Sequence, residues 1–394
     1  MTKLGILTTH PIQYQIPWFR ALAKIPNLDL TVFFCMMPDE HQQGDGFGVS
    51  FQWDIPLLEG YRYEVLENVA RKPSLSEFSG CDTPGIALVV RKGGYDAFIV
   101  NGWVVKSCLQ LLWACRQYQI PCIVRGEANN LRPRAGWKRL IHRLLLSQYG
   151  AFLTIGEGNR RFYLNNGVAE EKLFRAPYCI ENTRFATAAN ALRESRSAIR
   201  ASLNIPEEAI VFLFCAKFID KKRPMDILRA LAQLQAGADG QFDIHVLMVG
   251  TGELLDACKA YVKQASLPVT FAGFLNQSEI ARAYVAADCQ VLPSDHGETW
   301  GLVVNEGMAC GLPAIVSDQV GCHLDLITPG LTGEVYPMGN VGALADRMRA
   351  FAADPPGLRS LGEQARQRVF TDYSVNNVVD GTLKALRFVS GQAG

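Results

Sequence analysis

The sequence predicts an α/β protein of two doubly wound, Rossmann-like domains. Three observations carry this prediction. Short, continuously apolar segments alternate with segments of helical length, the alternation occurs twice, and a stretch rich in polar residues separates the two runs. Continuous apolar strands are typical of parallel sheets that helices cover on both faces. With 394 residues, 48% of them hydrophobic, the chain is long enough to bury two cores.

The first run of alternating segments starts at the amino terminus. Its predicted elements are strand 4–8, helix 17–24, strand 30–35, strand 97–100, helix 106–118, strand 121–125, strand 151–155 and helix 159–166. Residues 36–91 follow neither period clearly. Within them the Gly-rich residues 43–48 indicate a flexible loop, and residues 51–57 indicate a strand.

A stretch of Pro and polar residues, 177–187, has the composition of a linker and places the domain boundary near Asn182. The first domain is therefore predicted at 1–182 and the second at 183–370. The elements predicted after the boundary are strand 210–215, helix 225–234, strand 245–250, helix 253–265, strand 269–272, helix 277–287, strands 288–293 and 314–317, and helices 341–352, 357–370 and 375–389.

Composition and charge narrow the class of protein. The 39 Lys and Arg residues balance 38 acidic ones, so charge gives no reason to expect a nucleic-acid partner. Eleven cysteines, an odd number without a Cys-x-x-Cys pair, are expected to be small buried hydrophobes in a reducing compartment. No window reaches ~18 uninterrupted apolar residues, and the first residues resemble a core strand rather than a signal peptide. We therefore expect a cytoplasmic protein.

The stretch from Asp295 to Pro313, DHGETWGLVVNEGMACGLP, combines two acids with the start of a predicted helix. Glu298 lies in the loop and Glu306 lies a little over one turn into the helix. Both carboxylates can therefore face the same binding site. The amides of residues 300–303 suit a phosphate, and acids beside an anion site suit hydroxyl groups. A nucleoside diphosphate sugar offers both groups. Two Glu at this spacing, without further context, are more often surface acids.

Two lysines are predicted at the carboxyl edge of the same sheet. Lys217 ends one strand and Lys222 follows in the next loop. Ligands of open parallel sheets bind beyond the carboxyl ends of the strands, where two cations can neutralise a departing diphosphate. A lysine-rich loop by itself is more often merely solvated. Because the chain has no Asp-x-Asp pair to hold a metal and diphosphate, we predict that the reaction needs no metal ion and no other cofactor.

Together these residues resemble the family-4 retaining glycosyltransferases of the GT-B fold. The family signature is a Glu-x7-Glu pair that continues as Glu-Ala-Met-Ala-x-Gly-x-Pro-Val, for which this chain has Gly307 in place of the first Ala and Ala314 in place of Val. The resemblance is strongest over residues 211–337. It implies a fold in which the two domains face each other across a cleft. It also implies that residues after about 371 pack back onto the first domain.

The resemblance also implies roles for the donor-side residues. Glu298 is expected to hold sugar hydroxyls, Glu306 the ribose, and the two lysines the diphosphate, although the first lysine stands where the family has Arg. The residues expected to bind the donor are Lys217, Lys222, Gly250, Phe274, Leu275, Glu298, Thr299, Trp300, Gly301, Leu302 and Glu306. In relatives the residues at the positions of Phe274 and Leu275 lie by the nucleobase. The residues expected to act in catalysis are Glu298, Lys222, Lys217 and His10.

Four residues are expected on the acceptor side, all near the carboxyl ends of strands in the first domain: His10, Gln13, Trp103 and Glu127. The loop after the first strand departs from the family, in which many members have a Gly-Gly pair there. His10 either positions an acceptor hydroxyl or caps the following helix. Trp103 either stacks on a sugar ring or packs in the core.

Residues 131–149 predict a basic amphipathic helix. The chain carries no acid between Ala128 and Gly156, and apolar residues recur at helical spacing. In one interpretation the segment 132–143 lies on an anionic membrane surface at the inner face of the membrane. In the other it is an ordinary helix of the domain with a solvated basic face.

We therefore expect a retaining, metal-independent hexosyltransferase. It would move a sugar from a nucleoside diphosphate sugar, such as a UDP-sugar, to a carbohydrate or lipid-linked acceptor in bacterial polysaccharide or glycolipid assembly. A small soluble acceptor and a non-catalytic carbohydrate-binding subunit of the same fold are the alternatives. A dinucleotide-dependent oxidoreductase would need Gly-x-Gly-x-x-Gly after a first strand, and neither half supplies it.

Overall fold

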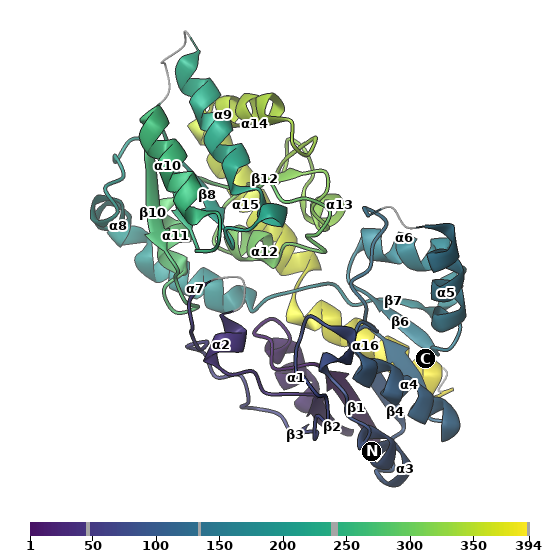
Figure 1. The fold of residues 1–394 in the computed structure, drawn as a ribbon. Coiled ribbons are helices and arrows are strands. Elements are labelled where there is room, and N and C mark those ends of the chain that lie inside the picture. Colours follow the sequence, from purple (N-terminus) through teal and green to yellow (C-terminus); the bar gives the residue numbers. More distant parts are fainter. Residues whose placement is uncertain (45–47, 133–134, 238–242, 392–394) are drawn as a thin grey trace. The chain divides into compact units, whose positions relative to one another are not determined.

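The computed structural model describes residues 1–44, 48–132, 135–237 and 243–391, and the chain folds as two compact units (Figure 1). The first unit consists of Met1–Pro38, Pro56–Ile180 and Tyr373–Gly394. The second consists of Asp39–Ile55 and Glu181–Asp372. The segment Asp39–Ile55 is thus part of the second unit, whereas the domain ranges predicted from sequence had assigned it to the first.

The first unit is built on a seven-stranded sheet in the order β3-β2-β1-β4-β5-β6-β7, with parallel pairing throughout. The strands are β1 (Thr2–Thr8), β2 (Leu28–Phe34), β3 (Tyr63–Val65), β4 (Ala97–Val100), β5 (Cys122–Val124), β6 (Ala151–Thr154) and β7 (Leu173–Arg175). The helices are α1 (Ile16–Ala23), α3 (Ile86–Lys92), α4 (Lys106–Gln117), α5 (Gly136–Leu146), α6 (Glu157–Asn165) and α16 (Val375–Val389). The strand order reverses between β1 and β4.

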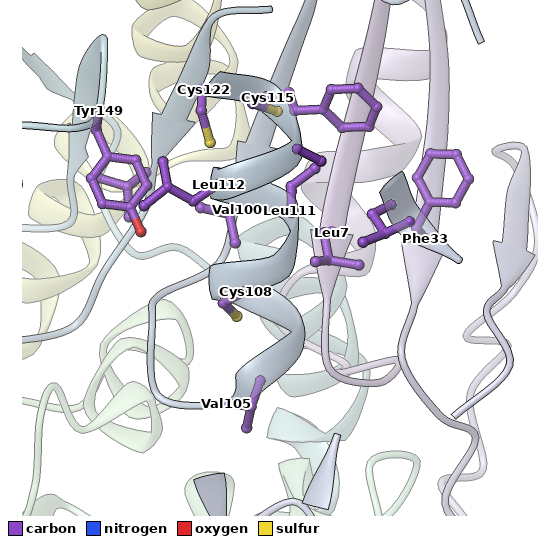
Figure 2. Packing of buried hydrophobic residues seen from close by; sticks show 14 of the residues in the cluster. Leu7, Phe33, Val100, Val105, Cys108, Leu111, Leu112, Cys115, Cys122 and Tyr149 are labelled. Atoms are coloured by element: carbon purple, nitrogen blue, oxygen red, sulfur yellow. The ribbon is translucent and has the colours of Figure 1, made fainter. Parts of the chain in front are cut away.

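Apolar side chains fill both faces of this sheet. On one face α4 buries Cys108, Leu111 and Leu112 against Leu7 and Val100 of the central strands (Figure 2). On the other face α1 and α16 pack together, and the Trp18 indole Nε1 donates to Thr382 Oγ1 at 3.1 Å. A Cβ at Gly381 would lie 1.9 Å from the Arg175 carbonyl oxygen, so α16 lies directly on the chain at β7.

The second unit is built on a six-stranded sheet in the order β10-β9-β8-β11-β12-β13, again parallel throughout. The strands are β8 (Ile210–Cys215), β9 (Ile244–Val249), β10 (Val269–Gly273), β11 (Cys289–Leu292), β12 (Ala314–Ser317) and β13 (Gly333–Tyr336). The helices are α2 (Glu40–Gln43), α7 (Asn182–Leu192), α8 (Arg196–Ser202), α9 (Pro224–Ala236), α10 (Leu255–Ala265), α11 (Ala281–Ala286), α12 (Leu302–Ala309), α13 (His323–Leu326), α14 (Val341–Ala353) and α15 (Pro355–Asp372). Here the order reverses between β8 and β11.

Several local predictions were wrong. Residues 51–57 form no strand, because Phe51 and Trp53 pack into an aromatic cluster and Pro56 cannot donate to a ladder. Only the second half of the predicted linker 177–187 is helical, because α7 starts at Asn182 and buries Phe185 and Ala189. The short elements β3, β7 and α3 were not predicted. Three predicted segments lie partly outside the described residues: the loop 43–48, the basic segment 132–143 and the C-terminal segment 371–394.

The cysteines behave as the sequence predicts: all eleven are buried and unbridged. Within the described part of the chain, no helix is long and apolar enough to cross a membrane.

Candidate functional site

The candidate donor site lies where the strand order of the second sheet reverses. Open parallel sheets bind ligands at this point because the loops that follow the two central strands diverge and leave a crevice. Lys217 follows β8, Lys222 ends the short turn after it, and Glu298 lies in the loop after β11. The neighbouring strands β8 and β11 therefore bring the predicted lysines and the first predicted acid to one edge.

Lys222 and Glu298 form an ion pair at this edge. The two side chains are only 14% and 13% exposed, so water screens the pair weakly. The loops that carry them are also joined by their backbones, since the Asp295 amide donates to the Lys221 carbonyl at 2.9 Å. Lys217 is half-buried and follows β8 at the same edge of the sheet. The site thus holds an acid and two cations in a partly desolvated position.

Two glycines allow the loops to approach closely. Gly250, after β9, has φ +125°, and a Cβ there would lie 2.0 Å from the Ala216 carbonyl oxygen. Gly301, before α12, has φ +102°, and a Cβ there would lie 2.8 Å from the Leu292 side chain. Both positions require glycine for conformation and for space. They leave bare backbone along the carboxyl edge of the sheet.

Glu306 lies on α12 and is 2% exposed, which rules out the interpretation of this residue as a surface acid. Its Oε2 accepts a hydrogen bond of 2.6 Å from the Tyr284 hydroxyl of α11. Burial raises the pKa of the Cys215 thiol to about 12, and the negative charge of Glu306 adds to this rise. Glu306 is therefore held in one orientation beneath the edge of the sheet.

The other predicted donor-side residues take different positions. Trp300 is buried, and its indole Nε1 donates to Asn305 Oδ1 at 2.9 Å, so its side chain fixes the start of α12. Thr299 is exposed, and Leu302 is half-buried at the first turn of α12. Phe274 and Leu275 are half-buried and follow β10 at the end of the sheet.

In the first unit the strand order reverses between β1 and β4, and the residues there form a neutral hydrogen-bond network. The Thr8 hydroxyl donates to Gln15 Oε1 at 3.0 Å, and the Asn101 side-chain amide donates to the same oxygen at 3.1 Å. Gln15 is buried and had not been predicted. The predicted Gln13 is half-buried two residues earlier. Its neighbour Gln15 is the residue that joins the two central strands.

His10 follows β1 and is half-buried, with its Nδ1 2.9 Å from Thr9 Oγ1. Burial lowers the pKa of His10 to about 4, so the ring is neutral at pH 7. A neutral imidazole can accept a proton or a hydrogen bond from a hydroxyl group.

Trp103 packs rather than projecting freely. Its ring stacks on Phe162 with centroids 6.2 Å apart and planes 16° apart, and a Cβ at Gly126 would lie 2.6 Å from it. Glu127 is exposed and accepts a hydrogen bond from the Tyr178 hydroxyl. Of the two alternatives for Trp103, the structure favours packing.

Arg125, which follows β5, is a residue that the sequence analysis did not select. It is 6% exposed, and its guanidinium lies 4.4 Å from the Tyr178 ring centroid and 5.1 Å from that of Trp18. Among the described residues no carboxylate pairs with it, and its buried Nε has no hydrogen-bond partner. Two aromatic faces thus hold this buried cation. Only the unusual Arg at a strand end signals it in the sequence.

Comparisons with known proteins agree with this geometry. Residues 195–368 match the family model described as glycosyl transferases group 1. An N-acetyl-alpha-D-glucosaminyl L-malate synthase from Bacillus anthracis is 27% identical over 48% of this chain and 48% of its own length. A D-inositol 3-phosphate glycosyltransferase from Mycobacterium tuberculosis is 30% identical over 50% of this chain and 41% of its own. The chain thus matches about half the length of these curated relatives.

Solved structures extend the likeness in fold to the whole chain. A glycosyltransferase from Rickettsia africae superposes with a TM-score of 0.77 at 15% identity, covering 100% of this chain and 99% of that one. HepE from Anabaena, solved with UDP and glucose, has a TM-score of 0.69 at 14% identity over 98% and 99% of the two chains. The two parallel sheets are therefore those of the GT-B fold. Within that class, residues 195–368 resemble the group 1 glycosyl transferases.

Proposed function

We propose that this protein transfers a sugar from a nucleoside diphosphate sugar to an acceptor hydroxyl with retention of the anomeric configuration. The ion pair of Lys222 and Glu298 at the reversal of the second sheet, with Glu306 on the adjacent helix, carries the proposal. A diphosphate that enters this edge competes with Glu298 for Lys222. Glu298 is then released to accept hydrogen bonds from the hydroxyls of the donor sugar.

In the proposed reaction the bond between the anomeric carbon and the β-phosphate oxygen breaks as the acceptor oxygen bonds to the same face of that carbon. The acceptor proton passes to the departing phosphate oxygen, so the products are a glycoside and a nucleoside diphosphate. Lys217, Lys222 and the first amides of α12 would stabilise the charge that grows on the diphosphate. Because these groups supply positive charge, we propose that the reaction needs no metal ion.

Sugar transfer and nucleotide binding are tested separately. A thermal-shift screen against UDP-, GDP-, ADP- and dTDP-sugars should raise the melting temperature with at least one donor, because a ligand of the folded state stabilises it. Incubation with that donor should release the nucleoside diphosphate and, with an acceptor, give a product whose anomeric coupling in NMR matches the donor. Activity abolished by EDTA and restored by Mg²⁺ would contradict the metal-free reaction. Binding without any release would favour the non-catalytic carbohydrate-binding subunit.

The surface of α5 supports a membrane-bound or lipid-linked acceptor. Its apolar side chains face outward: Trp137 is 63%, Leu140 61% and Leu144 63% exposed. An ordinary domain helix would bury these residues. Lys138, Arg139 and Arg143 are exposed on the same helix. Exposed apolar residues beside cations fit an anionic bilayer, into which such a helix inserts its apolar side. We therefore propose that the protein works at an anionic membrane surface, in polysaccharide or glycolipid assembly.

Vesicle binding tests this location. The protein should sediment with vesicles of phosphatidylglycerol and phosphatidylcholine at low salt but not with phosphatidylcholine alone. The double variant Leu140→Gln/Leu144→Gln should lose binding, whereas Trp113→Gln, which alters another exposed apolar residue (56%) on α4, should keep it. Equal binding by both variants would overturn the role of α5.

A small soluble acceptor is the second candidate. The names of two relatives specify L-malate and inositol 3-phosphate, which are small hydroxylated molecules. Turnover with a soluble acceptor in the absence of vesicles would favour it.

A further inference from the structure

The segment Asp39–Ile55 precedes most of the first unit in the chain, yet it packs on the second unit at the end of β10. The Asn276 side-chain amide donates to the Gln52 carbonyl oxygen at 2.7 Å. Two residues later, the Ser278 amide donates to both carboxylate oxygens of Asp54 at 3.2 Å, and its hydroxyl donates to the same carboxylate. These bonds attach the segment to the loop that follows β10.

Hydrogen bonds also join described residues within the segment to one another. Asp39 and Gln42 form a capping box at the start of α2, and the Phe51 amide donates to the Glu40 carbonyl oxygen at 3.3 Å. The Trp53 amide donates to Gln43 Oε1, also at 3.3 Å. The two arms of the segment are therefore bonded to each other, which places Phe51 at a defined position.

Phe51 joins an aromatic cluster with Phe274. Its ring centroid is 4.5 Å from that of Phe274 and 4.8 Å from that of Trp53, which meets it edge-on at 84°. Phe51 is 9% exposed, whereas Phe274 is half-buried. Phe51 thus packs against Phe274 and limits the directions in which that ring can turn.

The position of this cluster suits the base of a nucleotide. If the diphosphate lies at the end of β8, the end of β10 is two strands away, about 10 Å at the usual spacing of strands. Gly250, which follows β9 between them, lies against the Ala216 carbonyl after β8. On the opposite side the ends of β12 and β13 are joined by a polar contact, from the Met338 amide to Asp318 Oδ1 at 3.0 Å. Aromatic rings, which suit a planar base, gather on the β10 side.

We propose that residues 48–55 are part of the donor site and that Phe51 is a positioning residue, which holds Phe274 where the nucleobase stacks. This inference rests on the proposed function, because it takes the diphosphate to lie at the β8 edge. It adds a segment from the first part of the chain to a site otherwise built from residues after Cys215.

Calorimetric titration with UDP, GDP, ADP and CDP, and with inorganic pyrophosphate, tests the inference. Phe51→Ala should weaken the preferred nucleoside diphosphate by about tenfold, the scale of one aromatic contact, and change pyrophosphate binding by less than about twofold. Phe51→Tyr, which keeps the ring, should restore binding. Asn276→Ala/Ser278→Ala, which leaves the buried ring untouched, should weaken nucleotide binding in the same direction. Phe78→Ala, at an exposed Phe of the first unit (52%), is the matched control and should bind like the wild type.

The outcomes separate the two proposals. Unchanged nucleotide binding in Phe51→Ala, or an equal loss for pyrophosphate, would overturn the role of Phe51 while leaving the donor site intact. If the wild-type protein binds none of the four nucleoside diphosphates, the proposed function and this inference both fail.

Discussion

The two units share a topology and differ in how they hold polar groups where the strand order reverses. In the second unit the ends of β8 and β11 carry an ion pair, Lys222 with Glu298. In the first unit the ends of β1 and β4 carry a neutral network in which Gln15 Oε1 accepts from Thr8 and Asn101. The same crevice is thus lined by charge in one unit and by neutral hydrogen-bonding groups in the other. This difference suits a division in which one unit handles a diphosphate and the other a hydroxyl group.

Buried arginines repeat the contrast. Arg200 of the second unit, 2% exposed, donates to the Asp288 carboxylate at 2.8 Å and to the carbonyl oxygens of Ala286 and Ala209. Arg125 of the first unit lies between two aromatic rings. A buried cation such as Arg200, whose donors are taken up by hydrogen bonds within the protein, stabilises the fold. A buried cation whose Nε has no hydrogen-bond partner keeps a donor that a ligand can use.

The largest expected effect breaks this contrast between arginines. Arg200→Met should lower the free energy of unfolding by about 3–5 kcal/mol. The substitution leaves buried carbonyl oxygens without a donor and part of the Asp288 charge unpaired. Arg125→Met should change it by less than about 1 kcal/mol, since it removes ring contacts but also a buried cation without a carboxylate partner. Urea denaturation of both variants measures the difference. Similar losses would show that Arg125 is as structural as Arg200.

The next prediction concerns the ion pair of the donor site. Lys222→Met should leave the Glu298 carboxylate unpaired and cost about 2–3 kcal/mol of stability, with a fall in sugar transfer of about 10²–10³-fold. The double variant Lys222→Met/Glu298→Gln should regain most of the stability but none of the activity. Lys221→Met, at the exposed neighbouring lysine, is the control. Recovery of transfer in the double variant would contradict a role for Lys222 beyond stability.

Two glycines that follow strands, one in each unit, give a smaller difference in the free energy of unfolding. Gly250→Ala, after β9, should cost about 3 kcal/mol or more, because the new Cβ would lie 2.0 Å from the Ala216 carbonyl oxygen and the φ of +125° is unfavourable. Gly102→Ala, after β4, should cost about 1 kcal/mol, because φ is +84° but nothing lies within 4 Å of the new Cβ. Chemical denaturation of each variant measures the difference, and equal losses would show that conformation alone matters.

The parts of the fold that the sequence predicts well are those governed by local patterns. Strands such as β4 and β12 are short apolar runs whose ends coincide with Gly, Pro or polar residues, and the order of elements indicated two parallel sheets. The segment Asp39–Ile55 could not be assigned, because its bonds run to residues 276 and 278, more than 200 positions away. No period or turn signal encodes such a contact.

The same limit applies to the candidate sites. The resemblance selected Lys222, Glu298 and Glu306, and the sheet order brings the first two together. It could not show that Glu306 is buried against Tyr284, since that contact joins two helices. Gln15 was missed because only the adjacency of β1 and β4 gives its side chain both partners. Chemistry carried by a motif can be predicted, whereas chemistry assembled by packing needs the structure.

The smallest expected effect is a pH dependence that arises in both units. Burial lowers the pKa of His10 in the first unit to about 4, and it also lowers the pKa of His245 in the second. The unfolded chain binds a proton near pH 6.5 while folded His10 stays neutral, so its contribution is complete above that pH. Acidification from pH 6.5 towards 4 should cost at most about 2 kcal/mol for His10, because the side chain is only half-buried. Denaturation across this range in wild type and His10→Gln measures it.

The two histidines also separate stability from function at the sheet edges. His10→Gln should remove part of the stability loss in acid and leave the part due to His245. The Nε2 of His245 lies 2.9 Å from Thr270 Oγ1, near the amino end of β9 rather than at the carboxyl edge of the sheet. His245→Gln should flatten the other part. If His10 is the group that meets the acceptor, only His10→Gln should also raise the KM for the acceptor. An equal effect of both substitutions on that KM would mean that His10 serves the fold of the first unit in the way that His245 serves the second.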